Sequence, residues 1–496
     1  MRKQLWAVVL AVGLALAVQF GCNGGAPQTG AGVGTVPGSV VVFGGDAPLC
    51  GILSFVVTIN GITLVPQTGG SPVSILPTGK SVTLDYASLI DFTTFLTSAN
   101  VAPGTYSGMT LTLSNPQLTY LDTTKVPPAP TTITPTFSSL TVNLDLNPAV
   151  TLKSNGTVGL RVDFDLLHSV QTDSTGQITG DVTPIFTVTQ PSAGASTGFA
   201  ELDDLRGIVQ SVSTTSTNTA FTGSFQLQPS GGPALTVNVN DSTTFYGVTA
   251  LGSLTSNTYV EGRAFIDASG NIVAEEVVAE EQEDAATGKA AFRGLVTSVA
   301  RDGSGNATQL TLFVAEESPD VSGEVPLRSL LTVNLSPSSG FGISAPTANL
   351  ASFSLGPATL GIGQQVVVHG QLPTPATTPV SVDARAVYLG LQSILGDLST
   401  NPSSPVVVGT DGKTGGFTLL PCSPVFQSQP ITEITYLQTT FDGLNSLIDL
   451  NVPGQHFLSL KGLLFYQQAP GQVNSVTWAA PANVQTATGV HQLSGP

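Results

Sequence analysis

The chain has 496 residues, of which only 9% are charged, and its formal net charge is −17. A chain of this length exceeds one ordinary hydrophobic core, so several domains are expected. A surface this acidic repels phosphate backbones and anionic lipid headgroups, which argues against a nucleic acid partner. The 54 glycines and 34 prolines indicate many short strands joined by turns.

Residues 1–22, MRKQLWAVVLAVGLALAVQFGC, have the pattern of an export signal: two basic residues and then a short apolar run. The Gly21-Cys22 pair that ends this segment resembles the lipobox of bacterial lipoproteins. The resemblance implies that Cys22 is lipidated, becomes the new N-terminus and attaches the mature chain to a membrane. The alternative is cleavage after Ala17, with Cys22 incidental. We expect an exported lipoprotein, anchored in the cell membrane or outer membrane and facing the periplasm or the cell surface.

Residues 23–37 are rich in glycine and lack core-forming side chains, so they are predicted to form a flexible tether before the first folded domain. No later segment approaches 18 consecutive apolar residues, so we expect no transmembrane helix in the mature chain. Cys50 and Cys422 are the other two cysteines. Export permits a disulfide between them, but we expect two separate buried thiols, because a bridge would tie the first folded domain to the last.

Residues 38–190 contain many strand-length segments of β-branched and apolar residues, among them SVVVFGG, LSFVVTI and YSGMTLTL. Segment 88–100 instead spaces its apolar residues by three to four positions, which predicts one short amphipathic helix. The pair Asn155-Gly156 predicts a hairpin turn between the strands on either side of it.

Two carboxylates of this region, Asp163 and Asp165, alternate with apolar residues and therefore project from one strand face. A calcium site would need several such oxygens together with loop carbonyls. Arg161 lies on the same face and offers either carboxylate a cation. We therefore expect a salt-bridged or solvated face here.

Three motifs of this region resemble the family of bacterial lipoprotein domains of unknown function numbered 4382. They are Asp46-Ala47-Pro48, Pro103-Gly104-x-Tyr106 and Asp163-Phe164-Asp165, and the resemblance covers most of residues 38–190. It implies a prealbumin-like β-sandwich and an export context. It implies no reaction, because the family has no assigned chemistry.

The phrase RGIVQSV at 206–212 returns as RGLVTSV at 293–299, and similar strand segments follow each copy in the same order. A third, diverged set of strands follows, which lacks the opening G-x-V phrase. Aligned without gaps, the copies share one phenylalanine position and one strand glycine: Phe245, Phe341 and Phe441, and Gly262, Gly370 and Gly462. The predicted division is a linker at 191–204, β repeats at 205–284 and 291–395, a linker at 396–405 and a diverged β repeat at 406–493.

Each repeat has five or six short strands, enough for a small closed barrel or a compact sandwich. The repeats resemble the domain-of-unknown-function family numbered 5666, which is found repeated in exported bacterial proteins. The expected fold class is all-β: a prealbumin-like β-sandwich with one short helix, followed by three small β-barrel or sandwich modules in tandem.

Arg206 and Arg293 open the first two repeats, and AEEVVAEEQED at 274–284 is the only dense run of charge. The arginines could form a binding element, and the acidic run could hold a cation. We expect instead solvated arginines at strand starts, and a strand edge that continues into an acidic, solvated linker.

The last repeat is the most aromatic part of the chain. Strand alternation places Tyr466 on a leucine-rich face, which should be the core, and Phe465 with Ser459 and Lys461 on the outside. If Trp478 also lies outward, Phe465 and Trp478 could stack on a sugar or a partner surface. The alternative, which we favour, is that Trp478 caps the core.

The four histidines are scattered and have no neighbouring ligand at metal spacing, so no metal, cofactor or catalytic residue is predicted, and we expect no enzyme. We predict a non-catalytic, lipid-anchored protein of the cell envelope whose tandem β modules act as a binding or spacer scaffold. Its candidate partners are a cell-surface polysaccharide and an envelope protein. The alternative is a carbohydrate-binding protein or an accessory to polysaccharide utilisation.

Overall fold

The computed structural model describes residues 36–493, except 48, 90–91, 126–128, 175–176, 195–197, 230–232, 320–324, 345–354, 374–379, 403–404, 427–428, 436–445, 452–456, 468–474 and 480–489. Cys22, the predicted signal and Phe441 lie outside the described residues. In the described part of the chain the single α-helix is α1 (Leu166–Ser169). No helix in these ranges is long and apolar enough to cross a membrane.

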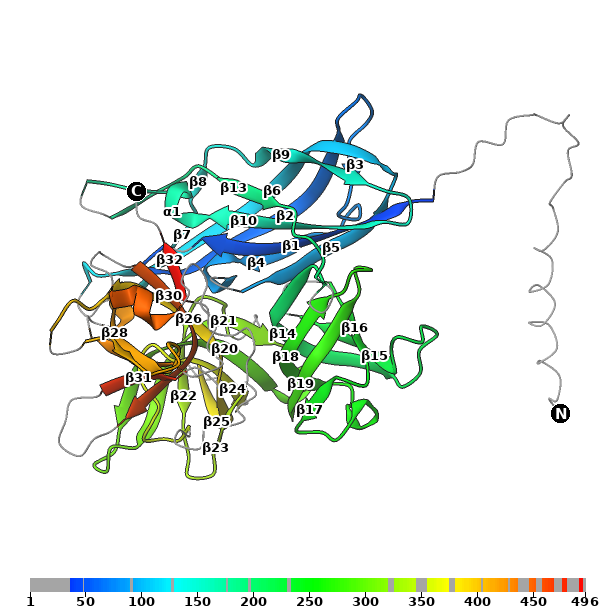
Figure 1. The fold of residues 1–496 in the computed structure, drawn as a ribbon. Helices are drawn as coiled ribbons and strands as arrows, with labels where there is room; N and C mark the ends of the chain where they lie inside the picture. The colour runs from blue at the N-terminus through cyan, green and yellow to red at the C-terminus, as the bar shows by residue number, and fades with distance from the viewer. Residues whose placement is uncertain are drawn as a thin grey trace, which may run out of the picture.

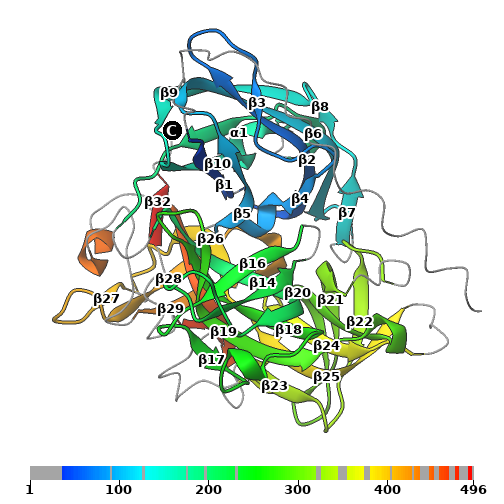
Figure 2. The same cartoon turned by 90° about the vertical axis from the view of Figure 1, so that its right-hand side faces the viewer.

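The predicted all-β fold, a β-sandwich followed by three small modules, is confirmed. The first domain lies against the modules, which Figures 1 and 2 show below it. Short 3-10 turns connect some strands: η1 (Tyr86–Leu89), η2 (Leu251–Ser253), η3 (Ala285–Thr287), η4 (Pro424–Phe426) and η5 (Leu447–Asn451).

The first domain packs two sheets face to face around one core. The sheet ordered β13-β10-β1-β5 contains β1 (Gly38–Ala47), β5 (Thr94–Val101), β10 (Thr157–Asp165) and β13 (Phe186–Thr189). The sheet ordered β3-β2-β6-β7, with β4 beside β2 and β9 beside β6, contains β2 (Ile52–Pro66), β3 (Val73–Ser74), β4 (Val82–Asp85), β6 (Gly104–Asp122), β7 (Ala129–Ile133) and β9 (Thr141–Leu152). A small third sheet contains β8 (Thr136–Phe137), β11 (Val170–Thr172) and β12 (Ile178–Val182).

Strand β1 is buried on both of its faces. Val40 and Val42 belong to the sandwich core. Val41 and Phe43, which point the other way, belong to the core of the first module. A continuous apolar run such as VVVF is typical of a strand covered on both sides, so the first domain and the first module share a packed interface.

The predicted helix at 88–100 is wrong. Tyr86–Leu89 forms the turn η1, and Thr94–Val101 is strand β5, which pairs antiparallel with β1. Within β5, Leu96 points into the sandwich core, whereas the neighbouring Phe95 packs on the first module. A turn followed by a strand can reproduce a three-to-four spacing of apolar residues. Pairing with β1 supplies the backbone hydrogen bonds that decide between the two structures.

The predicted hairpin at Asn155-Gly156 is also wrong, although the turn exists. Asn155 has φ +55°, and the Gly156 N–H donates to the Lys153 carbonyl at 3.0 Å. The strands that it joins lie in different sheets, because β9 pairs with β6 and β10 pairs in parallel with β1. The turn therefore connects the two layers of the sandwich.

The first two modules have the same strand order. The first contains β14 (Ala200–Ser213), β15 (Gly223–Gln228), β16 (Leu235–Val239), β17 (Thr244–Tyr246), β18 (Thr258–Ile266) and β19 (Ile272–Gln282). The second contains β20 (Lys289–Arg301), β21 (Ala307–Ser318), β22 (Leu330–Asn334), β23 (Gly340–Ile343), β24 (Gln365–Gln371) and β25 (Ser381–Leu389). Pairings β16–β19 and β22–β25 close each sheet into a small barrel.

The predicted equivalence of Phe245 and Phe341 agrees with these registers. Phe245 lies beside Val277 in the first barrel, and Phe341 lies beside Val387 at the matching place in the second. Each ring is partly buried against the core of its own barrel. The duplicated sequence therefore folds into duplicated structure.

The third module contains β26 (Gln392–Leu398), β27 (Val407–Val408), β28 (Gly415–Pro421), β29 (Ile431–Thr435), β30 (Phe457–Gln467), β31 (Ser475–Ala479) and β32 (Val490–Leu493). Strand β26 pairs with both β28 and β30, as the opening strands β14 and β20 do with their counterparts. The third sheet thus begins at Gln392, inside the range assigned to the second repeat, and the first part of the predicted linker 396–405 is strand.

The third module lacks the G-x-V phrase, as its sequence Gly396-Asp397-Leu398 shows, but it keeps the opening glycine. At Gly207, Gly294 and Gly396 an added Cβ would collide with a backbone carbonyl oxygen of the next strand. Those carbonyls belong to β15, β21 and β28, which are equivalent strands. The same close backbone approach therefore marks the start of all three modules.

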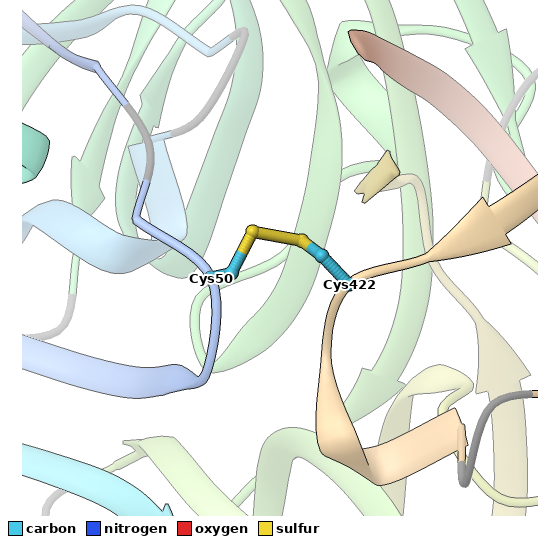
Figure 3. The surroundings of a disulfide bond; sticks show 2 residues. All are labelled: Cys50 and Cys422. Carbon is cyan, nitrogen blue, oxygen red and sulfur yellow. A yellow bond between two sulfur atoms is a disulfide. The ribbon is translucent and has the colours of Figure 1, made fainter. Parts of the chain in front are cut away.

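Cys50 and Cys422 form a disulfide, so the prediction of two separate thiols is wrong. Cys50 lies between β1 and β2 of the first domain, and Cys422 follows β28 of the third module (Figure 3). Their Cα atoms are 5.7 Å apart although 372 positions separate them in sequence. The chain folds back on itself, so that its last module lies against its first domain.

Candidate functional site

The predicted ligand surface on β30 is covered. Tyr466 belongs to the core of the third barrel, as strand alternation predicts. Phe465, on the opposite face, is only 1% exposed and packs with Leu463 in the core of the second module. The prediction that Phe465 lies outside is therefore wrong. Trp478 lies in β31 with its backbone beside Leu464, and its side chain is outside the described residues.

The rest of this face of β30 is buried too. Ser459 is 1% exposed and Lys461 is 3% exposed. The Lys461 ammonium lies 4.4 Å from the ring centroid of Phe92 in the first domain. Polar residues on this strand face a neighbouring domain, where a cation–π contact replaces water around the ammonium.

Arg293 is buried and Arg206 is largely buried rather than solvated, and both lie close to Glu316. The Arg206 guanidinium donates to both carboxylate oxygens of Glu316, at 2.6 and 2.5 Å. An Arg293 nitrogen lies 3.9 Å from the same carboxylate. Burial alone would raise the pKa of Glu316, but the arginines lower it to about 2. Arg206 thus joins the first module to the second, whereas Arg293 supports the same carboxylate from within the second module.

The acidic run 274–284 is not a solvated linker. It forms most of β19 and contacts the second module, where His369 is completely buried. The two ring nitrogens of His369 lie 2.6 Å from Glu283 and 2.5 Å from Glu280. Arg385 lies 2.9 Å from Glu283 and is a second internal cation. The carboxylates of the acidic run therefore pair with cationic side chains of the second module, His369 and Arg385.

Stability is expected to fall as pH rises through the titration of His369. Burial alone would lower its pKa, but the hydrogen bonds that its ring N–H groups donate to Glu280 and Glu283 raise it from 6.5 to about 9. The folded state thus binds the proton more tightly than the unfolded state. The contribution, about 3 kcal/mol, is complete below pH 6.5 and is lost as the pH rises through about 9. Urea unfolding across this range measures it.

The variant His369→Gln should flatten the pH dependence of the unfolding free energy in this window and lower stability at neutral pH. The matched control is His168→Gln, because His168 is largely exposed and pairs with Asp165 at the surface. An unchanged slope in His369→Gln would contradict the assignment.

The carboxylates of β10 behave as predicted. Arg161 Nε lies 2.8 Å from Asp163, and Asp165 accepts from the His168 backbone N–H at the start of α1. Among the described residues no group of three histidine, cysteine, aspartate or glutamate side chains is placed to hold a metal ion.

Three cavities meet where the first domain contacts the modules, and Asp85 of β4 lines all of them. Their volumes are about 600, 140 and 110 Å³. Asp85 accepts hydrogen bonds from the Ser54 hydroxyl at 2.6 Å and the Phe55 N–H at 2.8 Å. Burial raises the pKa of Asp85 by more than these two hydrogen bonds lower it. The largest of these three cavities is the candidate functional site.

Sequence reasoning missed Asp85, Glu316, Arg328 and His369 as members of this junction. One signal was available for His369, which interrupts the apolar strand VVVHGQL. A lone titratable residue within an apolar strand must find a partner when the strand is buried. No comparable pattern marks Asp85 or Arg328, because their neighbours come from other domains.

Comparison with known proteins identifies one part of the chain. Residues 38–179 match the family described as "Domain of unknown function (DUF4382)". No curated protein matches. A solved structure described as "drosophila Unr CSD456" aligns with 59% of this chain and 97% of its own, at 10% identity and a TM-score of 0.14. That likeness carries no argument at this TM-score. The first domain, at 38–179, is thus similar to a family whose function is unknown.

Proposed function

We propose that the protein is an exported, lipid-anchored and non-catalytic scaffold of the cell envelope, in which the β modules form one braced body. The observation that carries the proposal is the Cys50–Cys422 disulfide. Disulfides form and persist in oxidising compartments outside the cytosol. The bridge also supports a compact scaffold rather than an extended string of modules, because it ties the two ends of the folded chain together.

The buried charges support the same proposal. Arg206 pairs with Glu316 across the first two modules, and His369 pairs with Glu280 and Glu283 across the same junction. Such pairs set one relative orientation of the modules, because separating them would leave charges without partners. A scaffold that presents surfaces in a defined arrangement needs such an orientation.

The anchor is tested at the mature N-terminus. Mass spectrometry of the protein from its native membrane is expected to show an acyl mass on Cys22, and Cys22→Ser should move the protein from the membrane to the soluble fraction. The disulfide should form in both proteins, since Cys22 takes no part in it. A free N-terminus at Val18 without acyl mass would refute the anchor and leave the braced fold intact.

The alternative function, carbohydrate binding, loses its first support because Phe465 is buried. Its remaining support is the cavity between the first domain and the first two modules, which is lined by both polar and apolar residues. This alternative does not exclude the scaffold, since a braced body can also hold a ligand at the junction of its parts.

A further inference from the structure

The largest cavity lies at the junction of three parts of the chain. Its wall includes Thr83 and Asp85 of the first domain, Gln210 and Asn257 of the first module, and Arg328 of the second. Ligand pockets in proteins commonly measure about 300–1,000 Å³ and favour domain interfaces. At about 600 Å³ this cavity is of that size and in that kind of place.

Several polar groups of the wall are not used by the fold. The side-chain amides of Gln210 and Asn257 are exposed and make no hydrogen bond to any residue that the structure describes. Arg328 has φ +61°, in the left-handed region that non-glycine residues rarely adopt, and its Nε is buried without a hydrogen-bond partner in the described ranges. Strained backbone and unused donors at one cavity are typical of binding sites.

Five carboxylates and one arginine line the cavity, and several of the carboxylates are paired with cations of this chain. Glu316 is paired with Arg206, and Glu283 is paired with His369 and Arg385. Arg328 is the nearby cation of Asp85, so these three carboxylates have cations within the chain and need no bare cation as a ligand. A bare anion is disfavoured, because carboxylates outnumber cations in the wall. The hydrogen-bonding capacity that remains is the Arg328 Nε donor and the acceptor positions of the Asp85 carboxylate beyond those used by Ser54 and Phe55.

We propose that this cavity binds a neutral, polyhydroxylated ligand: a short oligosaccharide. A hydroxyl group both donates and accepts, so neighbouring hydroxyls of a sugar can donate to Asp85 while they accept from Arg328 and the amides of Gln210 and Asn257. Pro229, Pro319 and Leu327 line the same cavity, and they offer apolar surface to the C–H face of the ring. The site goes beyond the scaffold function, which stands whether or not a sugar binds.

Titration calorimetry on the mature chain tests the proposal with four probes: maltotriose, cellotriose, laminaritriose and N-acetylchitotriose. At least one is expected to bind saturably in the millimolar range or tighter. Spermidine and inorganic phosphate are the charged comparators. If none of the four sugars binds, or if a charged comparator binds at the cavity more tightly than all of them, the proposal is overturned.

The double variant Gln210→Ala/Asn257→Gly locates the binding. Both side chains are exposed, and glycine tolerates the φ of +65° at position 257, so the fold should persist. Affinity should fall about tenfold or more, because two hydrogen bonds are lost. The matched control is Gln117→Ala/Asn115→Gly on the first domain, where both residues are exposed and Asn115 has φ +49°.

The control variant should bind the sugar as the unmodified chain does. Thermal unfolding of both variants checks that the fold is unchanged. Equal affinity in the cavity variant and the control would overturn the proposal, because the sugar would then bind elsewhere.

Discussion

Removing the disulfide with Cys50→Ser/Cys422→Ser is expected to release the third module from the first domain. A bridge across 372 positions closes a very long loop, and its loss should cost about 5 kcal/mol, the upper end of the usual range. Because the chain has several cores, this loss should separate one cooperative thermal transition into two or more. Differential scanning calorimetry measures the change.

Limited proteolysis should show which part of the chain is released when the disulfide is removed. In the double variant, cleavage is expected to begin in residues 392–493, while the first domain, which has its own core, stays resistant. Cys22→Ser is the matched control, since it replaces a cysteine outside the bridge. Identical calorimetric traces for the two variants would show that the contact between Lys461 and Phe92 and its surroundings suffice without the bridge.

The second large effect is expected from Glu316→Ala. This carboxylate is the common partner of two buried arginines, one from each of the first two modules. Its removal takes away the hydrogen-bonded carboxylate of Arg206 and a nearby counter-charge of Arg293, which should cost about 3–5 kcal/mol in the unfolding free energy. Denaturant unfolding of the mature chain measures the loss.

A matched control is Glu275→Ala, because Glu275 lies 3.8 Å from Arg263 and its side chain is 39% exposed. That pair should contribute less than about 1 kcal/mol. The double variant Arg206→Leu/Glu316→Leu should lose less stability than the sum of the two single variants, because each residue is the hydrogen-bonded partner of the other. A double variant that lost the sum of both single effects would contradict the pairing.

Strand periodicity predicted the faces of individual strands well. On β30 it separated Tyr466 from Phe465, and the two rings do belong to different cores. It failed on which face meets water, because alternation shows which residues share a face but not what covers that face. The outward face of β30 in the third module packs against the second module and the first domain.

For the charged residues too, the local sequence pattern did not show which groups would cover them. Solvated arginines and an acidic linker are the ordinary outcome for such patterns. Here Arg206, Glu280 and Glu283 find partners 86 to 110 positions away in sequence.

Short-range order was therefore readable along the chain: strand-rich segments, the repeated phrase, equivalent Phe245 and Phe341, and the salt-bridged face of β10. These features depend on neighbours within a few positions or on comparison of one repeat with another. The disulfide, the strand at 94–101, the burial of Phe465 and the junction cavity were decided by tertiary contacts. Each depends on which domains pack together, and that is set by the sum of many small, distant interactions rather than by any local pattern.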